Sequence, residues 1–197
     1  MNIYLVTKNL GKLAAAQSVF NDSEITLLPV DKDYPEIQAN SSIEVARYTS
    51  LEVAKEKGLP AIREDHSIFI SALGNTPGPF MSYFEKKVSA DLLLQLLLNA
   101  EDRKGYFEVG TALAYPDGEV QEFVFRVPFT LAKEKRGTLQ NGWNQLIILD
   151  GETRTLAEYP EIERLHIWNQ NYLKIKSTLK TRLPSPASGS RESCLTC

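Results

Sequence analysis

The first third of the chain alternates between short apolar runs and polar segments. Residues 2–6 (NIYLV) and 25–30 (ITLLPV) are apolar runs of strand length, which predict two β-strands. Between them, residues 12–20 are rich in helix formers and carry apolar side chains at helical spacing, which predicts a helix. A strand, a helix and a second strand in this order indicate an α/β domain with parallel strands.

A long amphipathic segment follows at residues 42–57 and predicts a second helix. Ser41 or Ser42 could cap its start, and Gly58 would end it. Residues 60–63 then predict a short strand that leads into an acidic segment. Behind the acidic residues come a second apolar run, SIFISAL, and a loop rich in turn-forming residues.

In the second half of the chain the pattern of apolar and polar residues changes. Residues 89–98 predict a helix that is apolar on most sides, which is typical of a buried helix or an interface. Residues 104–131 carry a β pattern on both sides of a Pro-Asp-Gly turn at 116–118, which predicts a hairpin. A further strand at 145–149 and a helix at 161–182 complete the elements that we expect.

These elements predict one domain over residues 1–182, with a β-rich part of about residues 104–150 inserted into an α/β body. The tail, residues 183–197, is rich in Pro and Ser, and we expect it to be disordered. No internal repeat is visible in the sequence.

Composition and charge narrow the class of protein. A hydrophobic fraction of 43% and a charged fraction of 24% are ordinary for a globular protein. A net charge of −3 gives no electrostatic footprint for nucleic acid. No apolar run approaches the roughly 20 residues that span a membrane, and the N-terminus does not have the pattern of a signal peptide. Both cysteines, Cys194 and Cys197, lie in the tail, so we expect no disulfide framework and a cytoplasmic protein.

The loop TKNLGK, from Thr7 to Lys12, is the first candidate binding element. It lies between a predicted strand and a predicted helix, where backbone N–H groups and the positive end of the helix dipole favour an anion. Lys12 could reach a phosphate oxygen, and Thr7 and Asn9 could add neutral hydrogen bonds. The spacing is not that of a Walker A loop. Alternatively, Asn9 and Gly11 only form a turn and Lys12 is solvated.

Carboxylates form the second candidate. Glu36 lies in a loop before a helix, and Glu64 and Asp65 follow a predicted short strand. Carboxylates from separate loops can hold Mg²⁺, with Mn²⁺ as an alternative, against substrate phosphates. One carboxylate can also orient or deprotonate the attacking water. Alternatively, Glu64 and Asp65 form a solvated turn, and the adjacent His66 is a surface or packing residue.

Five segments in order resemble motifs of the inosine triphosphate pyrophosphatase family, along most of residues 2–175. TKNLGK resembles its opening loop, and YPEIQ, residues 34–38, its PE-x-Q segment. The stretch EDHSIFISALGNTPGPFMSYF, residues 64–84, resembles its most diagnostic motif. NGWN, residues 141–144, resembles its FGWDP segment, and TLAEYPEIER, residues 155–164, its T-x-AE segment.

The resemblance implies an elongated, two-lobed α/β fold, in which a mixed sheet flanked by helices surrounds a central cleft. It implies Mg²⁺-dependent hydrolysis of nucleoside triphosphates to a monophosphate and pyrophosphate. The substrates would be purine nucleotides with altered bases, such as inosine, deoxyinosine or xanthosine triphosphate. It also implies a homodimer.

The resemblance assigns roles to single residues. Lys12 would contact the triphosphate and Asp65 would help to activate water, as the catalytic residues. Thr7 and Asn9 would line the phosphate loop, and Glu36 and Asp65 would hold the metal ion. The residues that would hold the base are Gly142, Trp143, Asn144 and Arg164.

The sequence departs from the family pattern mainly where the base is recognised. Asn144 stands where the family has aspartate, and an amide offers both a donor and an acceptor. Arg164 replaces a lysine, and residues 168–170 (WNQ) replace Ser-His-Arg. Thr49 stands at the expected position of a further lysine, and His66 replaces a small Ser or Thr.

Two other functions stay open beside the pyrophosphatase. One is a catalytically weak or inactive nucleotide-binding paralogue with an altered base pocket. The other is a Maf-like pyrophosphatase, against which the ALGNTPG stretch argues.

Overall fold

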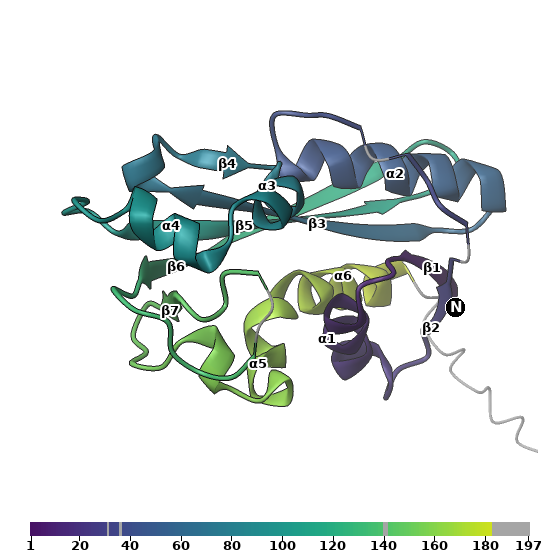
Figure 1. Cartoon of the computed structure of the whole chain (residues 1–197). Coiled ribbons are helices and arrows are strands. Elements are labelled where there is room, and N and C mark those ends of the chain that lie inside the picture. Colours follow the sequence, from purple (N-terminus) through teal and green to yellow (C-terminus); the bar gives the residue numbers. More distant parts are fainter. Residues whose placement is uncertain (31, 36, 140–141, 183–197) are drawn as a thin grey trace, which may run out of the picture.

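The computed structural model describes residues 1–30, 32–35, 37–139 and 142–182. In this part of the chain a seven-stranded mixed sheet runs in the order β2-β1-β3-β5-β6-β7, and β4 pairs with β3 beside this path (Figure 1). β1 is parallel to β2 and β3, and the other pairs are antiparallel. The strands are β1 (Asn2–Val6), β2 (Thr26–Pro29), β3 (Ala61–Ile70), β4 (Thr76–Gly78), β5 (Lys104–Ala114), β6 (Val120–Leu131) and β7 (Ile147–Leu149).

Helices flank the sheet on both faces, so the predicted α/β fold class is confirmed. The long helix α2 covers one face, and α1, α5 and α6 gather on the other (Figure 1). The helices are α1 (Leu10–Phe20), α2 (Ser42–Lys57), α3 (Met81–Lys87), α4 (Ala90–Leu96), α5 (Glu161–Trp168) and α6 (Gln170–Arg182). Two short 3-10 helices are η1 (Ser71–Leu73) and η2 (Leu156–Glu158).

The alternation of side chains along β3 divides the core between the two faces. Ala61 packs with Val53 and Ala54 of α2, whereas Ile62 packs in a cluster with residues of α1 and α6. Further along the strand, Ile68 belongs to a third cluster with the β5–β6 hairpin. Since successive side chains of a strand point to opposite faces, even-numbered residues of β3 share one face, which meets α1 and α6 at Ile62, and odd-numbered residues face α2.

The helix predicted at 42–57 is confirmed at both ends. The side chain of Ser41 accepts a hydrogen bond from the backbone N–H of Glu44, which is the contact of an N-terminal cap. Gly58 ends the helix in the left-handed conformation with φ 68°, which costs glycine little. The hairpin predicted over 104–131 is confirmed as well, since β5 and β6 pair along their whole length.

Three predictions about elements are wrong. The expected short strand at 60–63 and the apolar run behind it form one strand of ten residues, β3. The helix expected at 161–182 is interrupted at Asn169, between α5 and α6. The helix expected at 89–98 is shorter and amphipathic, because Leu93 is buried whereas Leu96 is 56% exposed.

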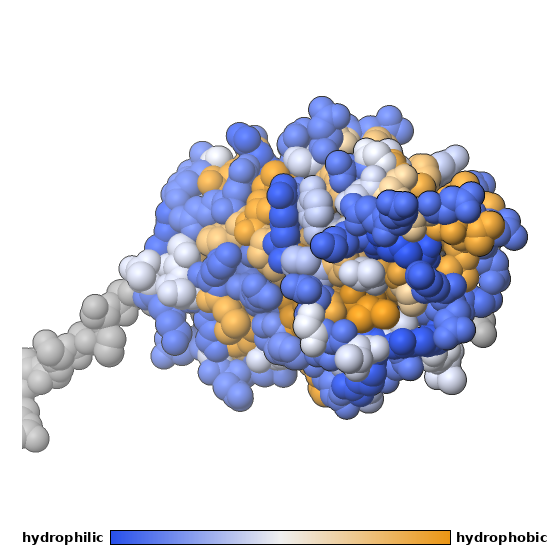
Figure 2. Space-filling model, turned by 90° about the vertical axis from the view of Figure 1, so that its left-hand side faces the viewer, coloured by the Kyte–Doolittle hydropathy of each residue, from blue (hydrophilic) through white to orange (hydrophobic). Residues whose placement is uncertain are grey.

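Several leucines of this region are exposed. Figure 2 views the end of the molecule that carries α4, where hydrophobic groups lie among polar side chains. Leu92, Leu96 and Leu98 are the exposed members. Among the helices that the structure describes, none combines the length and apolarity needed to cross a membrane. The predicted tail, residues 183–197, lies outside the described residues.

Candidate functional site

The candidate site lies where strand pairing along one edge of β3 is interrupted. β5 pairs with β3 along its whole length. On the other side, β1 pairs with residues 61–63 and β4 with residues 68–70. Residues 64–67 have no strand partner on that side among the described elements. A cleft of about 1140 Å³ opens there and is lined by Arg63, Asp65 and His66.

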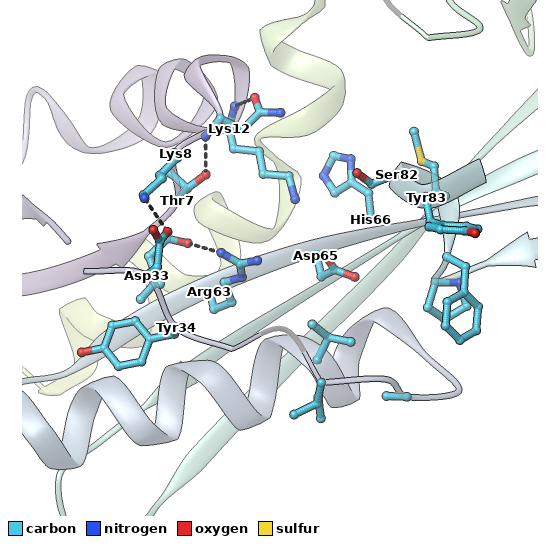
Figure 3. Close-up of a pocket in the computed structure, with 18 of the residues that line it drawn as sticks. Thr7, Lys8, Lys12, Asp33, Tyr34, Arg63, Asp65, His66, Ser82 and Tyr83 are labelled. Carbon is cyan, nitrogen blue, oxygen red and sulfur yellow. Dashed lines mark hydrogen bonds and ion pairs between the residues drawn. The ribbon is translucent and has the colours of Figure 1, made fainter. Parts of the chain in front are cut away.

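Segments far apart in the sequence line the rest of this cleft. At one end lies the loop from Thr7 to Lys12, and at the other lie Ser82 and Tyr83 of α3 (Figure 3). Asp65 and His66 lie between these two ends (Figure 3). The structure therefore brings the first loop and the acidic motif together, as the sequence predicted, in one cleft.

Asn9 shapes the first loop as the N-cap of α1. Its side-chain oxygen accepts hydrogen bonds from the N–H groups of Gly11 at 2.9 Å and Lys12 at 3.1 Å. The hydroxyl oxygen of Thr7 in turn accepts from the N–H of Asn9 at 3.1 Å. These contacts form a turn at Asn9 and Gly11, which is the alternative function that the sequence left open for this loop. Thr7 and Asn9 also line the cleft, so their predicted phosphate contacts stay predictions.

Lys12 reaches across the interruption of the sheet. Its Nζ donates to the backbone carbonyl of Glu64 at 3.0 Å, so the ammonium group lies next to the residue that precedes Asp65. The neighbouring lysine, Lys8, also lines the cleft, and it pairs with Asp33. Lys12 is thus held against β3 rather than solvated at the mouth of the cleft.

Asp65 lies on the α2 face of β3, in the cleft. Its partner on β5 is Gly110. A Cβ on Gly110 would lie 2.6 Å from the backbone nitrogen of Ile43, so glycine lets the start of α2 approach the sheet closely. The first turn of a helix carries partial positive charge, which favours an anionic site nearby.

Glu36, the second predicted metal ligand, lies outside the described residues. Ile37 and Gln38, which follow it, line the cleft. Among the described residues no group of three His, Cys, Asp or Glu side chains is placed to hold a metal ion. The predicted metal site therefore depends on Asp65 and on a residue that the structure does not describe.

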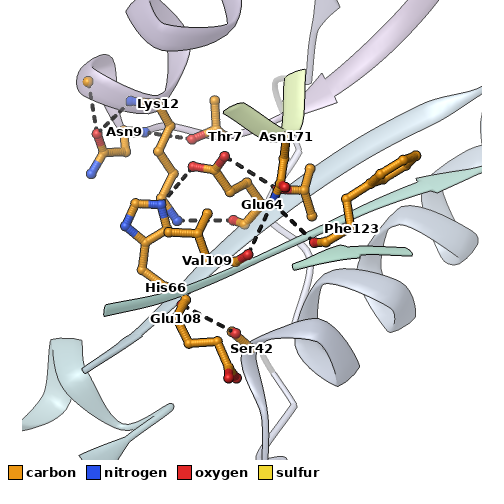
Figure 4. Close-up of polar contacts among 12 residues, drawn as sticks. Thr7, Asn9, Lys12, Ser42, Glu64, His66, Glu108, Val109, Phe123 and Asn171 are labelled. Carbon is orange, nitrogen blue, oxygen red and sulfur yellow. Dashed lines mark hydrogen bonds and ion pairs between the residues drawn. The ribbon is translucent and has the colours of Figure 1, made fainter. Parts of the chain in front are cut away.

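Glu64 is not part of a solvated turn, so that alternative is wrong for this residue. Its side chain is 1% exposed, and its Oε1 lies 2.7 Å from Nε2 of His66 (Figure 4). Its Oε2 accepts from the hydroxyl of Thr111 at 3.4 Å. Burial and the nearby charge of Glu64 raise the pKa of Tyr172 well above its usual value. Glu64 thus belongs to a buried polar network.

His66 joins this network to the cleft. Its ring stacks on Trp168, with centroids 5.4 Å apart and planes inclined by 29°. Trp168 in turn meets Phe107 edge to face. Sequence reasoning treated His66 as a surface or packing residue and did not connect it to Glu64. The signal that could have connected them is strand alternation, which places residues i and i+2 on one face.

The end of the cleft opposite the first loop contains a carboxylate that sequence reasoning missed. Glu85 of α3 lines the cleft beside Gly142. A Cβ on Gly142, which has φ 53°, would lie 2.3 Å from Oε1 of Glu85. Burial raises the pKa of Glu85, and a hydrogen bond from the N–H of Trp143 at 3.4 Å opposes this shift in part.

Among the described residues that were predicted to hold the base, Gly142 alone lines the cleft. The ring of Trp143 is fully buried and donates from Nε1 to the carbonyl of Val88 at 2.7 Å, so in this structure it is a core residue. Arg164 is 7% exposed, on α5. The base contacts predicted for Trp143, Asn144 and Arg164 stay predictions, and Asn141 lies outside the described residues.

Comparisons with known proteins agree with this geometry. The model of the Ham1 family matches residues 3–169. The chain belongs to this family. It is 33% identical over 167 residues to a dITP/XTP pyrophosphatase of Methanopyrus kandleri, a match that covers 85% of this chain and 89% of that protein. It is also 33% identical to the protein of the same name from Thermococcus kodakarensis, over 85% of this chain and 90% of that protein.

Solved structures of Ham1 proteins share the fold. The protein from Coxiella burnetii is 27% identical, with a TM-score of 0.76, and the match covers 93% of this chain and all of that chain (100%). The Ham1 protein of Staphylococcus aureus is 22% identical, with a TM-score of 0.77 over 93% of this chain and 100% of that chain, and shows the fold alone. The family resemblance predicted from the sequence is confirmed.

Proposed function

We propose that this Ham1-family chain hydrolyses purine nucleoside triphosphates with altered bases to the monophosphate and pyrophosphate. Inosine, deoxyinosine and xanthosine triphosphate are the expected substrates. The observation that supports the proposal most strongly is the hydrogen bond between Lys12 and the backbone of β3. The Nζ of Lys12 lies 3.0 Å from the carbonyl of Glu64, beside Asp65, in a cleft large enough for a nucleotide. The names of the two archaeal relatives support the substrate class.

In this proposal, different residues of the cleft bind the triphosphate and activate the attacking water. Lys12 binds the triphosphate through its ammonium charge, and the partial positive charge at the start of α1 favours the same anion. Asp65 orients a water molecule and accepts its proton. The water oxygen then bonds to the α-phosphorus, the bond from that phosphorus to its bridging oxygen breaks, and pyrophosphate leaves.

We further propose that the reaction depends on a divalent cation, Mg²⁺ or Mn²⁺. Such ions take oxygen ligands, and the Asp65 carboxylate in the cleft is of the right kind. Asp65 would hold the ion together with Glu36. The ion would neutralise charge on the phosphates.

Residues 1–182 act as one domain and form a homodimer in this proposal. The continuous sheet from β2 to β7 supports the single domain. The leucines exposed on and after α4 support a contact between two copies, because Leu98 is 80% exposed and Leu96 is 56% exposed. Analytical ultracentrifugation of the wild type and of Leu98→Glu tests the contact, and a monomeric wild type would contradict it.

The experiment that tests the function is pyrophosphate release from inosine, xanthosine, guanosine and adenosine triphosphates and their deoxy forms. It is run with Mg²⁺, with Mn²⁺ and with a chelator. We expect release from inosine or xanthosine nucleotides and none with the chelator. Lys12→Met should lower kcat/KM about a hundredfold, the order expected for the loss of one or two charge-assisted bonds. Lys8→Met, which removes a lysine paired with Asp33, should lower it far less.

Two results would overturn the proposal. Release of inorganic phosphate in place of pyrophosphate would mean that a different bond is cleaved. A folded protein that releases pyrophosphate from none of these nucleotides would favour the nucleotide-binding paralogue.

A further inference from the structure

A chain of buried polar groups runs through the core and ends at the cleft. The side chain of Asn171 donates to the hydroxyl oxygen of Thr111 at 2.9 Å, and the hydroxyl oxygen of Thr111 lies 3.4 Å from Oε2 of Glu64. Asn171 and Thr111 are fully buried, and Glu64 is 2% exposed. Buried polar groups cost free energy unless they are hydrogen-bonded, so this network fixes Glu64 in one orientation.

The hydrogen bonds of this network have a defined direction. The amide nitrogen of Asn171 also contacts the carbonyl oxygens of Val109 at 3.0 Å and Phe123 at 3.1 Å, so the donor group must face these atoms. Thr111 therefore accepts from Asn171 and has its own O–H left for Glu64. With donors around it, the Glu64 carboxylate acts as an acceptor.

This direction determines which ring nitrogen of His66 carries a hydrogen toward Glu64. Because Glu64 accepts at 2.7 Å, that hydrogen lies on Nε2. In the neutral imidazole the other ring nitrogen, Nδ1, is an acceptor. Stacking on Trp168 holds the ring in place, and the side chain remains 18% exposed. A buried network thus presents a hydrogen-bond acceptor at the wall of the cleft.

The position of His66 indicates which part of a nucleotide it meets. Glu64 binds Lys12 through its carbonyl and His66 through its carboxylate, so the imidazole lies next to the ammonium group. In the cleft, His66 lies between Lys12 and Ser82 (Figure 3). With the triphosphate at Lys12, the next group along a nucleotide is its sugar.

We propose that His66 binds the sugar of the substrate, with Nδ1 accepting a hydrogen bond from a sugar hydroxyl. This inference rests on the proposed function. A hydroxyl is the donor that an unprotonated nitrogen selects, whereas a phosphate oxygen offers none. Glu64 is a positioning residue, because it acts on the substrate only through the orientation and hydrogen placement of His66.

Three inosine triphosphates that differ only in the sugar test the proposal: the ribo, 2′-deoxy and 2′,3′-dideoxy forms. We expect His66→Phe, which keeps a ring against Trp168, to lower kcat/KM about tenfold for the forms that carry the bound hydroxyl. It should change kcat/KM for the dideoxy form by less than about twofold. His166→Phe, at the exposed second histidine on α5, is the matched control and should behave as wild type.

Glu64→Gln separates positioning from folding. An amide can donate to Nε2 and move the hydrogen of the ring to Nδ1, which removes the acceptor without changing the size of the side chain. We expect this variant to lose the preference for a sugar hydroxyl while its Tm stays near that of the wild type. An equal loss of kcat/KM for all three nucleotides in His66→Phe, or no loss in any, would overturn the proposal.

Binding of the corresponding inosine monophosphates, followed by calorimetry, makes the test independent of turnover. If the wild type hydrolysed none of the triphosphates, the proposed function would fail by itself. A loss of affinity in His66→Phe that is confined to monophosphates with a hydroxyl would still support the sugar contact. Unchanged affinity for all three would reject it.

Discussion

Glu64 and Asp65 are adjacent in sequence and carry the same charge, yet the fold gives them opposite environments. Glu64 points toward α1 and α6, is 2% exposed and is surrounded by hydrogen-bond donors. Asp65 points toward α2 and lines the cleft. In a strand, neighbouring residues face opposite sides of the sheet, so two like charges need not share a site. One carboxylate organises the interior, and the other lines the cleft in which we propose that the nucleotide binds.

The largest effect that follows from this comparison is on catalysis. Asp65→Asn removes the group proposed to accept the proton of water, and we expect kcat to fall about a thousandfold or more. The Tm should change little, because the substitution keeps the size of the side chain. Pyrophosphate release under saturating substrate measures the effect. The control is Asp117→Asn in the turn before β6, and wild-type turnover in Asp65→Asn would show that another residue activates water.

The second largest effect is the loss of stability that we expect when Glu64 is replaced. Glu64→Ala leaves the hydroxyl of Thr111 and the ring of His66 without their acceptor. A buried donor left without its acceptor costs about 1–3 kcal/mol, so the free energy of unfolding should fall by at least this amount. Urea denaturation measures it, with Glu101→Ala at an exposed loop position as the control. A fall below about 1 kcal/mol would mean that water replaces the carboxylate.

Local signals were sufficient for much of the fold. Ser41 and Gly58 fixed both ends of α2 because capping chemistry depends on neighbouring backbone groups. The Pro-Asp-Gly turn located the hairpin of β5 and β6 for the same reason. These features need no knowledge of distant parts of the chain.

The prediction failed at β3 because its stability comes from distant partners. Two acidic residues in a row are typical of a turn, and the sequence does not show that Thr111, 47 residues away, accommodates Glu64 inside a strand. Asn171, which orders Thr111, is a further 60 residues along the chain. A pattern limited to neighbouring residues cannot contain such contacts.

The candidate site was predicted in part, and mainly through family resemblance. Lys12 and Asp65 were named from motifs, and the structure places both in the cleft. Glu85 was missed because Gly142, which approaches its carboxylate, is distant from it in the sequence. The stacking of Trp168 on His66 was missed because it joins α5 to β3, about a hundred residues apart in the chain. The predicted roles of the base-binding residues and of Glu36 stay predictions.

Gly110 tests whether the α2 face of β3 depends on close packing. A Cβ at this position would lie 2.6 Å from the backbone nitrogen of Ile43, so the start of α2 must move away from the sheet. We expect Gly110→Ala to lower the free energy of unfolding by about 1–3 kcal/mol, the usual cost of overpacking. It should also lower kcat, because the displaced helix start lies one strand from Asp65. Unchanged stability, measured by urea denaturation, would mean that α2 adjusts without cost.

A third carboxylate, Glu85, sharpens the comparison between Glu64 and Asp65. Glu64 is buried among several donors, whereas Glu85 accepts a hydrogen bond from the N–H of Trp143 at 3.4 Å. Burial raises the pKa of Glu85 from its usual 4.5. Since the folded state then holds this proton more tightly than the unfolded state, Glu85 costs stability as pH rises above 4.5, and the cost is complete above its folded pKa.

Glu85→Gln should remove this cost and give the smallest of the four effects. We expect its Tm to exceed that of the wild type at neutral pH, and the difference to disappear as pH falls through the raised pKa of Glu85 to the usual value of 4.5. Thermal unfolding of both proteins across this range measures the difference. The same substitution at the exposed Glu101 should give no pH-dependent difference. A difference for Glu85→Gln that stays constant with pH would mean that packing against Gly142, rather than loss of charge solvation, sets the stability at this end of the cleft.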